Sequence, residues 1–307
     1  MYEVVKILVP VSLTEVDETV LAWAAMIART RKAKNLDLVH VRAKTDIPDE
    51  VLEQFPEAAG DEDEIRRAME AEVEQRGGDL GKTEVGVAVL DGAPVTRILK
   101  HMAGKDYDLL ITGIRPGDSG RLAVSMARKA PCSVLVVPQH APAKVEEIAA
   151  AVDFSANSVD AVDVAARYAK HAGLKRIHLL HVFQVPLGYH STGKSYEEFA
   201  AIMRRNAERE FTRFLERCET QGVEVECHVE QSEHVAVRIP ELAQSLGADV
   251  LVIGARGRTA LAHLLLGSVT EHILVQSTIP VIAVKKKGAG LSILQILLRE
   301  AGLSDDD

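Results

Sequence analysis

The chain contains two copies of one unit, and this duplication constrains its fold more than any other feature. Asp108–Gly113 recurs as Asp249–Gly254, and His40-Val41 recurs as His181-Val182, both at an offset of 141 positions. Beyond that glycine the offset is 147, so that Gly120 aligns with Gly267. A constant register over most of each half indicates two related domains, the first of which lacks six residues in one loop.

Each copy alternates short apolar segments with amphipathic helical stretches, a pattern typical of a parallel α/β sheet. The second copy predicts strands near 147–152, 176–182, 223–230, 250–253 and 281–285, and helices near 156–172, 196–221, 235–247 and 269–276. Right-handed crossovers then give a doubly wound, Rossmann-like sheet of five parallel strands in the order 3-2-1-4-5. Ligands of such sheets bind beyond the carboxyl ends of the strands, where the first and fourth strands are neighbours. We therefore expect two tandem α/β domains.

The predicted boundaries place a first domain at 1–140, a second at 145–287 and a tail at 288–307. A short linker that contains Pro138 and Pro142 joins the domains and predicts that they sit close together. The tail carries an apolar helical face that is too short to span a membrane. We expect it to pack on its own chain or a second copy; a lipid surface is the alternative.

Composition narrows the function classes. A formal net charge of -9 argues against general nucleic-acid binding, and 4% aromatic residues leave few platforms for stacked bases. No apolar run reaches the ~20 residues that a membrane span needs, and the first residues lack a signal-peptide pattern. Cys132, Cys218 and Cys227 follow no disulfide or zinc spacing, which is typical of a reducing compartment. These observations predict a cytoplasmic location.

A glycine-rich segment in the second copy predicts an anion site. Gly254 and Gly257 follow the apolar segment 249–253, and after a further loop Gly267-Ser268 begins a predicted helix. Glycines allow close approach of the backbone, and a helix start offers free N–H groups and a positive dipole end. Arg256 and Arg258 can add charge-assisted bonds to phosphate.

Two residues of this region also have a purely structural interpretation. Ser268 and Glu271 have the spacing of a capping box, which a helix start favours without any ligand. Asp153 follows the first strand of the second copy and precedes the helix predicted at Ala156, so it is also a candidate cap. Since a helix start and an anion site can coincide, both interpretations stay open.

The spacing G-x2-G-x9-G-S, together with Asp153 and His181-Val182, resembles the ATP-binding type of universal stress protein. The resemblance covers both halves and implies a tandem member of that family with a regulatory role in the stress response. It implies that Asp153 and Val182 bind the adenosine part and that Gly254, Gly257 and Arg258 line the phosphates. Gly267, Ser268, Val269 and Thr270 would hold the β- and γ-phosphates, with Mg²⁺ accompanying the triphosphate.

The resemblance also concerns assembly, because universal stress domains often pair through their fifth strands. Here 134–137 and 281–284 would pair within one chain as an internal pseudo-dimer. Whether whole chains associate further, and with which protein partner, stays open.

The first copy departs from the nucleotide-binding pattern. Ser12 occupies the position of Asp153, and Arg121 occupies that of Ser268. The loop between Gly113 and Gly120 is six residues shorter than its counterpart and has Pro116 in place of Gly257. We therefore predict one competent nucleotide site, in the second copy.

A second phosphate motif occurs at Gly188–Ser195, which matches the P-loop pattern G-x4-G-K-[ST]. A P-loop follows its strand directly, whereas residues 183–187 intervene here. An NTPase using this loop is therefore an alternative, as are Lys194 acting as a lid over bound phosphates and a plain surface loop.

The sequence gives little support for a metal-binding or catalytic site. His178 and His181 lie three apart on a strand, so their side chains face opposite sides and cannot share a metal. No metalloprotease motif, nucleophile elbow or nucleophile-and-base grouping occurs, so no catalytic or metal-binding residue is predicted. We expect a regulatory ATP-binding protein with at most slow hydrolysis; a scaffold that holds a structural nucleotide is a further alternative.

Overall fold

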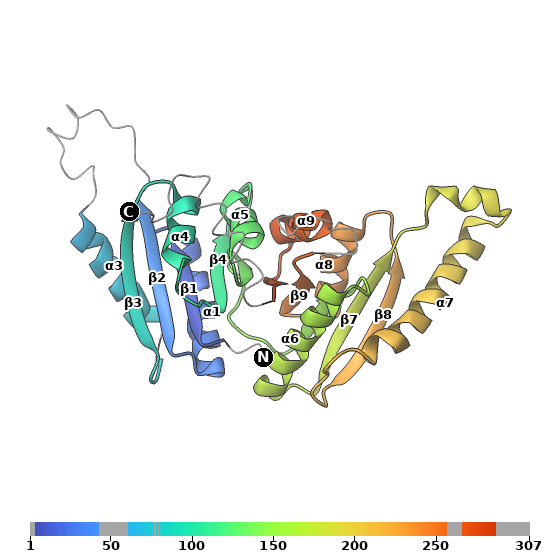
Figure 1. Cartoon of the computed structure of the whole chain (residues 1–307), viewed down its shortest axis with the longest axis horizontal. Helices are drawn as coiled ribbons and strands as arrows, with labels where there is room; N and C mark the ends of the chain where they lie inside the picture. The colour runs from blue at the N-terminus through green and yellow to red at the C-terminus, as the bar shows by residue number, and fades with distance from the viewer. Residues whose placement is uncertain (1–3, 43–60, 77, 79, 257–265, 287–307) are drawn as a thin grey trace, which may run out of the picture. The chain divides into compact units, whose positions relative to one another are not determined.

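A computed structural model of the chain describes residues 4–42, 61–76, 78, 80–256 and 266–286. The chain divides into two compact units, and the boundary between them lies at Ala143 and Lys144, inside the predicted linker. The predicted tail at 288–307 lies outside the described residues. Each unit is an α/β domain built on five parallel strands (Figure 1).

The first unit contains β1 (Lys6–Val11), α1 (Val16–Arg31), β2 (Asn35–Arg42), α3 (Glu62–Arg76), β3 (Glu84–Asp91), α4 (Pro94–Met102), β4 (Leu109–Ile114), α5 (Arg121–Lys129) and β5 (Ser133–Pro138). Its strands are parallel and lie in the order β3-β2-β1-β4-β5. Five of the six residues of β1 are buried, as expected for a central strand covered on both faces.

The second unit contains β6 (Ile148–Ala151), α6 (Ala156–Ala172), β7 (Arg176–Phe183), the 3₁₀ helix η2 (Leu187–Thr192), α7 (Tyr196–Leu215), β8 (Glu224–Gln231), α8 (Val235–Ser245), β9 (Val250–Gly254), α9 (Ser268–Gln276) and β10 (Val281–Val284). Its parallel strands follow the order β8-β7-β6-β9-β10. In both units the predicted order 3-2-1-4-5 is confirmed. The predicted pairing of 134–137 with 281–284 would be a contact between the two units, and it stays a prediction.

The helices cover both faces of the second sheet. The ring of His181 on β7 lies 6.2 Å from that of Phe211 on α7, whereas the next residue, Val182, lines a cavity with Ile239 of α8. Because neighbouring residues of a strand point to opposite faces, α7 and α8 lie on opposite sides of the sheet. Helix α9 packs beside α8 (Figure 1).

The same carboxylate contact occurs at equivalent positions of the two units. Asp108 accepts hydrogen bonds from the backbone of Val5 and Lys6 at 2.8 and 2.9 Å. In the second unit Asp249 does the same for the backbone of Glu146 and Glu147, at 2.7 and 3.1 Å. Each carboxylate thus fixes the start of the central strand of its own unit.

The predicted helix 196–221 is too long, because α7 ends at Leu215. The backbone N–H of Glu219 donates to Asp163 Oδ1 of α6 at 2.7 Å, a contact that a continued helix would not make. Gln221 and Gly222 then adopt positive φ, which completes the turn into β8.

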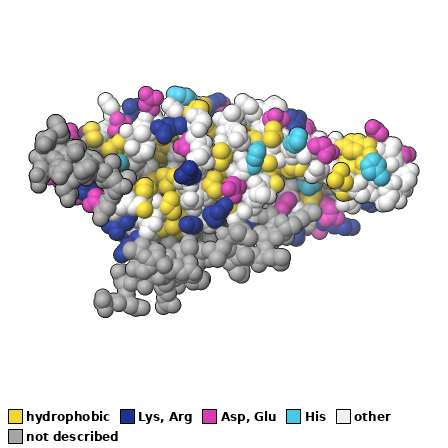
Figure 2. Space-filling model, turned by 90° about the horizontal axis from the view of Figure 1, so that it is seen from above, with side chains coloured by type: hydrophobic (Ala, Val, Ile, Leu, Met, Phe, Trp, Pro, Cys, Tyr) yellow, Lys and Arg dark blue, Asp and Glu magenta, His cyan; other side chains and the backbone are white. Residues whose placement is uncertain are grey.

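The surface carries charges of both signs. Acidic and basic side chains are interspersed with apolar ones on the face shown in Figure 2. Within the described part of the chain, no helix combines the length and apolar character that crossing a membrane requires.

Candidate functional site

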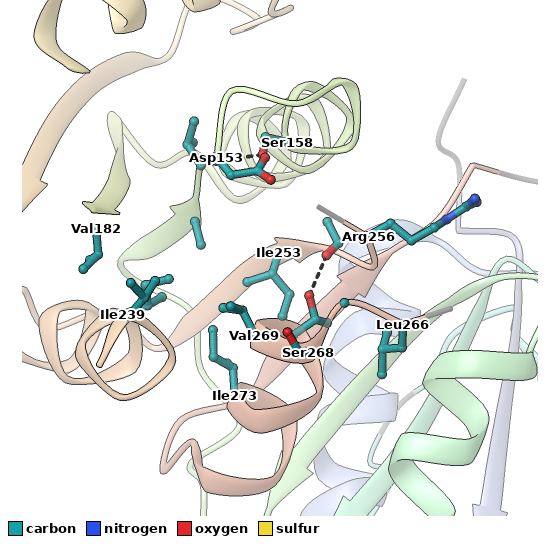
Figure 3. Close-up of a pocket in the computed structure, with 16 residues that line it drawn as sticks. Asp153, Ser158, Val182, Ile239, Ile253, Arg256, Leu266, Ser268, Val269 and Ile273 are labelled. Atoms are coloured by element: carbon teal, nitrogen blue, oxygen red, sulfur yellow. Dashed lines mark hydrogen bonds between the residues drawn. The ribbon is translucent and has the colours of Figure 1, made fainter. Parts of the chain in front are cut away.

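A cavity of about 400 Å³ lies at the carboxyl ends of β6, β7 and β9 in the second unit. Its walls also include the starts of α6, α8 and α9. Eight predicted site residues line it: Asp153, Val182, Gly254, Arg256, Gly267, Ser268, Val269 and Thr270. The two others, Gly257 and Arg258, lie outside the described residues. The structure therefore brings together every predicted site residue that it describes (Figure 3).

Asp153 is fixed at the rim where β6 meets α6. Its Oδ1 accepts a hydrogen bond from the Ser158 hydroxyl at 2.5 Å and one from the Ser155 backbone N–H at 3.0 Å. The cap of α6 is Ser155, whose side chain accepts from Ser158 N–H, so the interpretation of Asp153 as the helix cap is wrong. The carboxylate is half-buried and oriented by the helix start beside it, as Figure 3 shows.

The start of α9 forms the opposite wall, and it is not capped as predicted. Gly267 is the N-cap residue, and no side chain makes a capping bond there, so the predicted Ser268–Glu271 capping box is wrong. The helix accordingly begins at Ser268, one residue before the predicted start. The first backbone N–H to bond within the helix is that of Glu271, to Gly267 O. The N–H groups of the preceding turn are therefore left to other acceptors.

Two hydrogen bonds join the end of β9 to the start of α9. The Gly267 N–H donates to Ala255 O at 3.1 Å, and the buried Thr270 hydroxyl donates to Gly254 O at 3.0 Å. Arg256 and Leu266, the described residues on either side of 257–265, both line the cavity.

Gly254 has a packing role that the sequence did not reveal. A Cβ at this position would lie 3.0 Å from backbone atoms of Asn157 on α6. The equivalent Gly113 is tighter, because a Cβ there would lie 2.5 Å from Val16 Cγ2 on α1. Each glycine lets the first helix of its unit approach the fourth strand closely.

The cavity has two chemically different ends. Val182, Ile239 and Ile273 form an apolar end between β7, α8 and α9. Gly254, Gly267, Ser268 and Arg256 line the polar end. In Figure 3, Ser268 and Arg256 lie on the side of the cavity away from Val182. A ligand with a flat apolar part and an anionic tail matches this division.

The first unit places its polar groups differently. Ser12 occupies the position of Asp153, and the carboxylate comes instead from Asp17 on α1, where the second unit has Ser158. Asp17 is 6% exposed and accepts from Ser12 N–H and Thr14 N–H, both at 3.0 Å. The short loop is held by an Asp118 N–H bond to Arg115 O at 3.0 Å.

The segment 188–195 does not have the geometry of a P-loop. Residues 187–192 form η2, and backbone N–H groups of this segment bond locally, from Tyr189 to Pro186 O and from Gly193 to His190 O. Ser195 instead caps α7: its hydroxyl accepts from Glu198 N–H at 3.2 Å, and its own N–H donates to Glu198 at 3.0 Å. Because these groups are committed to local structure, the arrangement does not support the P-loop alternative. Lys194 is exposed and does not line the cavity, and its role as a lid stays a prediction.

Comparisons with known proteins agree with this architecture. The model of the universal stress protein family matches residues 3–138 and again 144–285. A universal stress protein of Methanocaldococcus jannaschii is 31% identical over 111 residues, which is 35% of this chain and 68% of that protein. Universal stress protein G of Escherichia coli is 31% identical over 36% of this chain and 77% of its own length. A universal stress protein structure from Archaeoglobus fulgidus covers 91% of this chain and 98% of its own, with a TM-score of 0.63 and 20% identity.

Proposed function

The chain belongs to the universal stress protein family, and we propose that it binds ATP, with Mg²⁺, in the cavity of its second unit. The two-ended lining of that cavity is the observation that carries the proposal. A volume of about 400 Å³ lies within the usual range for a small-molecule site. The position beyond the carboxyl ends of β6 and β9 is where doubly wound sheets bind ligands.

The apolar end would take the adenine ring. Val182 and Ile239 offer surfaces for its faces, and the backbone at Val182 lies at a strand end, where it can reach the edge of the base. Asp153 would accept hydrogen bonds from the ribose hydroxyls, since Ser155 and Ser158 fix its carboxylate at the rim. These assignments follow the resemblance in the glycine motif.

The polar end would take the phosphates. Uncommitted N–H groups at the start of α9 and its positive dipole end favour an anion beside Ser268, Val269 and Thr270. Arg256 and Arg258 would neutralise the phosphate oxygens from the loop side, and Gly254 and Gly257 would let the backbone approach them closely.

The described residues fit Mg²⁺ as a companion of the nucleotide. Mg²⁺ in nucleotide sites is held chiefly by phosphates and water, with one or two protein ligands. The exposed Ser268 hydroxyl at the polar end could supply an oxygen ligand. When bound, the ion would neutralise charge on the triphosphate.

We propose a regulatory role in the stress response rather than fast hydrolysis. Among the described residues that line the cavity, Asp153 supplies the carboxylate. It lies at the rim and already accepts two hydrogen bonds. A general base must reach the attacking water, and in the proposed binding mode Asp153 would lie beside the ribose instead. We also propose a cytoplasmic location, which is supported by three free thiols.

Gly267→Asp tests the proposal directly. Gly267 has φ -65° and ψ 140°, a conformation that any N-cap residue can adopt. Asp is therefore compatible with the backbone there and should cap the helix better than Gly by about a few tenths of a kcal/mol. The new carboxylate would lie against the phosphates, and two like charges at about 5 Å in a partly screened site cost about 3 kcal/mol. We therefore expect the Kd for ATP to rise roughly a hundredfold in isothermal titration.

Gly267→Asn is the matched control, since Asn caps the helix with almost the same shape but carries no charge. Its loss of affinity should be at most about tenfold, because only the competition for helix N–H groups remains. Thermal unfolding of both variants should match that of the parent chain. ATP binding by Gly267→Asp at the parent affinity would refute the proposed site.

A further inference from the structure

A cluster of ligand-type side chains lies on the second sheet, outside the ATP cavity. His178 on β7 pairs in register with Glu226 on β8, and His228 follows two positions later on the same face of β8. His178 lies four residues before Val182, about 13 Å towards the amino end of the strand. His181 faces the other side, as predicted, but the sequence pattern missed His228 because strand register was needed to find it.

The ligand atoms already have the spacing of a metal site. His178 Nδ1 lies 3.1 Å from His228 Nε2 and 3.2 Å from Glu226 Oε2. All three ligand atoms lie within 4.8 Å of one another. Two ligands bound to a tetrahedral Zn²⁺ at about 2.05 Å lie about 3.3 Å apart. An ion could therefore bind with small shifts of these side chains.

Neighbouring charges hold the cluster in place. Arg176 contacts Glu226 Oε1 and Glu147 Oε1, each at 3.1 Å, and its Nε also reaches Glu147 Oε2 at 3.5 Å. Glu226 Oε2 lies 3.2 Å from His178 Nδ1, on the other side of that carboxylate from the Arg176 contact. His178 is 3% exposed, and its Nε2 lies 3.3 Å from Glu147 Oε2 without the alignment of a hydrogen bond. A carboxylate beside the second nitrogen of a histidine is the usual outer contact of a metal-bound imidazole.

The first unit does not have the two histidines and the glutamate at the equivalent positions of its β2 and β3. Asp37 pairs there with Gly86, and Ala88 occupies the position of His228. Asp37 accepts a hydrogen bond from the Tyr107 hydroxyl at 2.6 Å, and Lys6 stands in place of Glu147. The same fold therefore forms without the cluster, so the sheet itself does not require it.

We propose that His178, Glu226 and His228 bind one Zn²⁺ ion, with Arg176 and Glu147 as positioning residues. Two imidazoles and one carboxylate form a ligand set that zinc accepts, and water would complete a tetrahedral site. Glu226 and His228 are half-buried, so the ion can enter from solvent. The ion would tie β7 to the edge strand β8.

The test uses the full chain, Zn²⁺ in isothermal titration, and Co²⁺ absorption as a probe of tetrahedral geometry. We expect one tight site per chain, and at least about a hundredfold weaker binding in His228→Ala and Glu226→Gln. Glu147→Gln should weaken binding about tenfold to a hundredfold, as loss of an outer contact does. His171→Asn, at an exposed histidine on α6, is the matched control and should bind as the parent does.

Circular dichroism would confirm that each variant is folded, and unchanged ATP affinity in His228→Ala would separate this site from the nucleotide cavity. Zinc affinity in folded His228→Ala and Glu226→Gln equal to that of the parent would overturn the proposal. Failure of the folded parent chain to bind one equivalent of Zn²⁺ would overturn it as well.

Discussion

At the scale of residues, the two units place a hydroxyl and a carboxylate at the same two positions, but in the opposite order. The first unit has a hydroxyl at the strand end, Ser12, and a carboxylate on the helix, Asp17; the second has Asp153 at the strand end and Ser158 on the helix. Asp17 is buried and holds backbone N–H groups, whereas Asp153 lines the cavity. The sequence indicates that Ser12 replaces Asp153, and the structure adds that Asp17 replaces Ser158 five residues later. The carboxylate is thus relocated and not lost.

Gly254 and Gly113 should be required for stability whether or not ATP binds. A Cβ at Gly254 would press on the backbone of Asn157, and one at Gly113 would press on Val16. We expect Gly254→Ala and Gly113→Ala each to lower the free energy of unfolding by about 1–3 kcal/mol, the usual cost of overpacking. Urea denaturation without nucleotide measures this.

Gly188→Ala is the control for these substitutions, since a Cβ there meets nothing within 4 Å. Its stability should stay within about 0.5 kcal/mol of the parent. Equal stability of all three variants would show that the close approach of helix to strand is not what selects glycine at 113 and 254.

At the scale of elements, hydrophobic patterning predicted helix bounds in the second unit well where capping residues and packing indicate the same ends. Helix α6 has the predicted bounds, because Ser155 caps its start and Gly173 adopts φ 72° at its end. The predictions were wrong where a distant contact decides. Asp163 on α6 accepts a hydrogen bond from the backbone that follows α7, so that helix ends earlier than predicted. The start of α9 has the sequence of a capping box but lacks a side-chain capping bond, and the sequence alone does not distinguish the two cases.

The loop at 188–195 should matter for the helix that follows it and not for nucleotide. Ser195→Ala removes the capping contact with Glu198 and should cost about 0.5–2 kcal/mol of stability. ATP affinity should be unchanged in Ser195→Ala and in Lys194→Ala, measured by titration. Ser191→Ala, whose hydroxyl only contacts Gly188 O, should keep both properties.

A large loss of ATP binding in Lys194→Ala or Ser195→Ala, with stability retained, would contradict this assignment. A loss in both variants would restore the P-loop interpretation that the sequence motif suggests, and a loss in Lys194→Ala alone would support Lys194 as a lid.

At the scale of the whole molecule, the repeat alone predicted two domains of the same topology. It also predicted which copy carries the cavity residues, because the glycine spacing and Asp153 occur together only in the second. The pairing of the fifth strands and the role of the tail were predicted from the family resemblance and the apolar pattern, and both stay predictions. The cluster around His178 depends on pairing between β7 and β8, which the sequence pattern did not provide.

We predict one bound nucleotide per chain, because the two units differ at the cavity position. The second unit combines an oriented carboxylate, an apolar wall and an uncapped helix start around one cavity. In the first unit the corresponding carboxylate is buried, and the shortened loop forms a compact turn at Arg115–Asp118.

The most direct test is a crystal structure of the full chain grown with excess ATP and Mg²⁺. We predict electron density for one triphosphate, with adenine beside Val182 and phosphates at the start of α9. Density for the nucleotide at 188–195 or in the first unit, with the cavity of the second unit empty, would contradict the account.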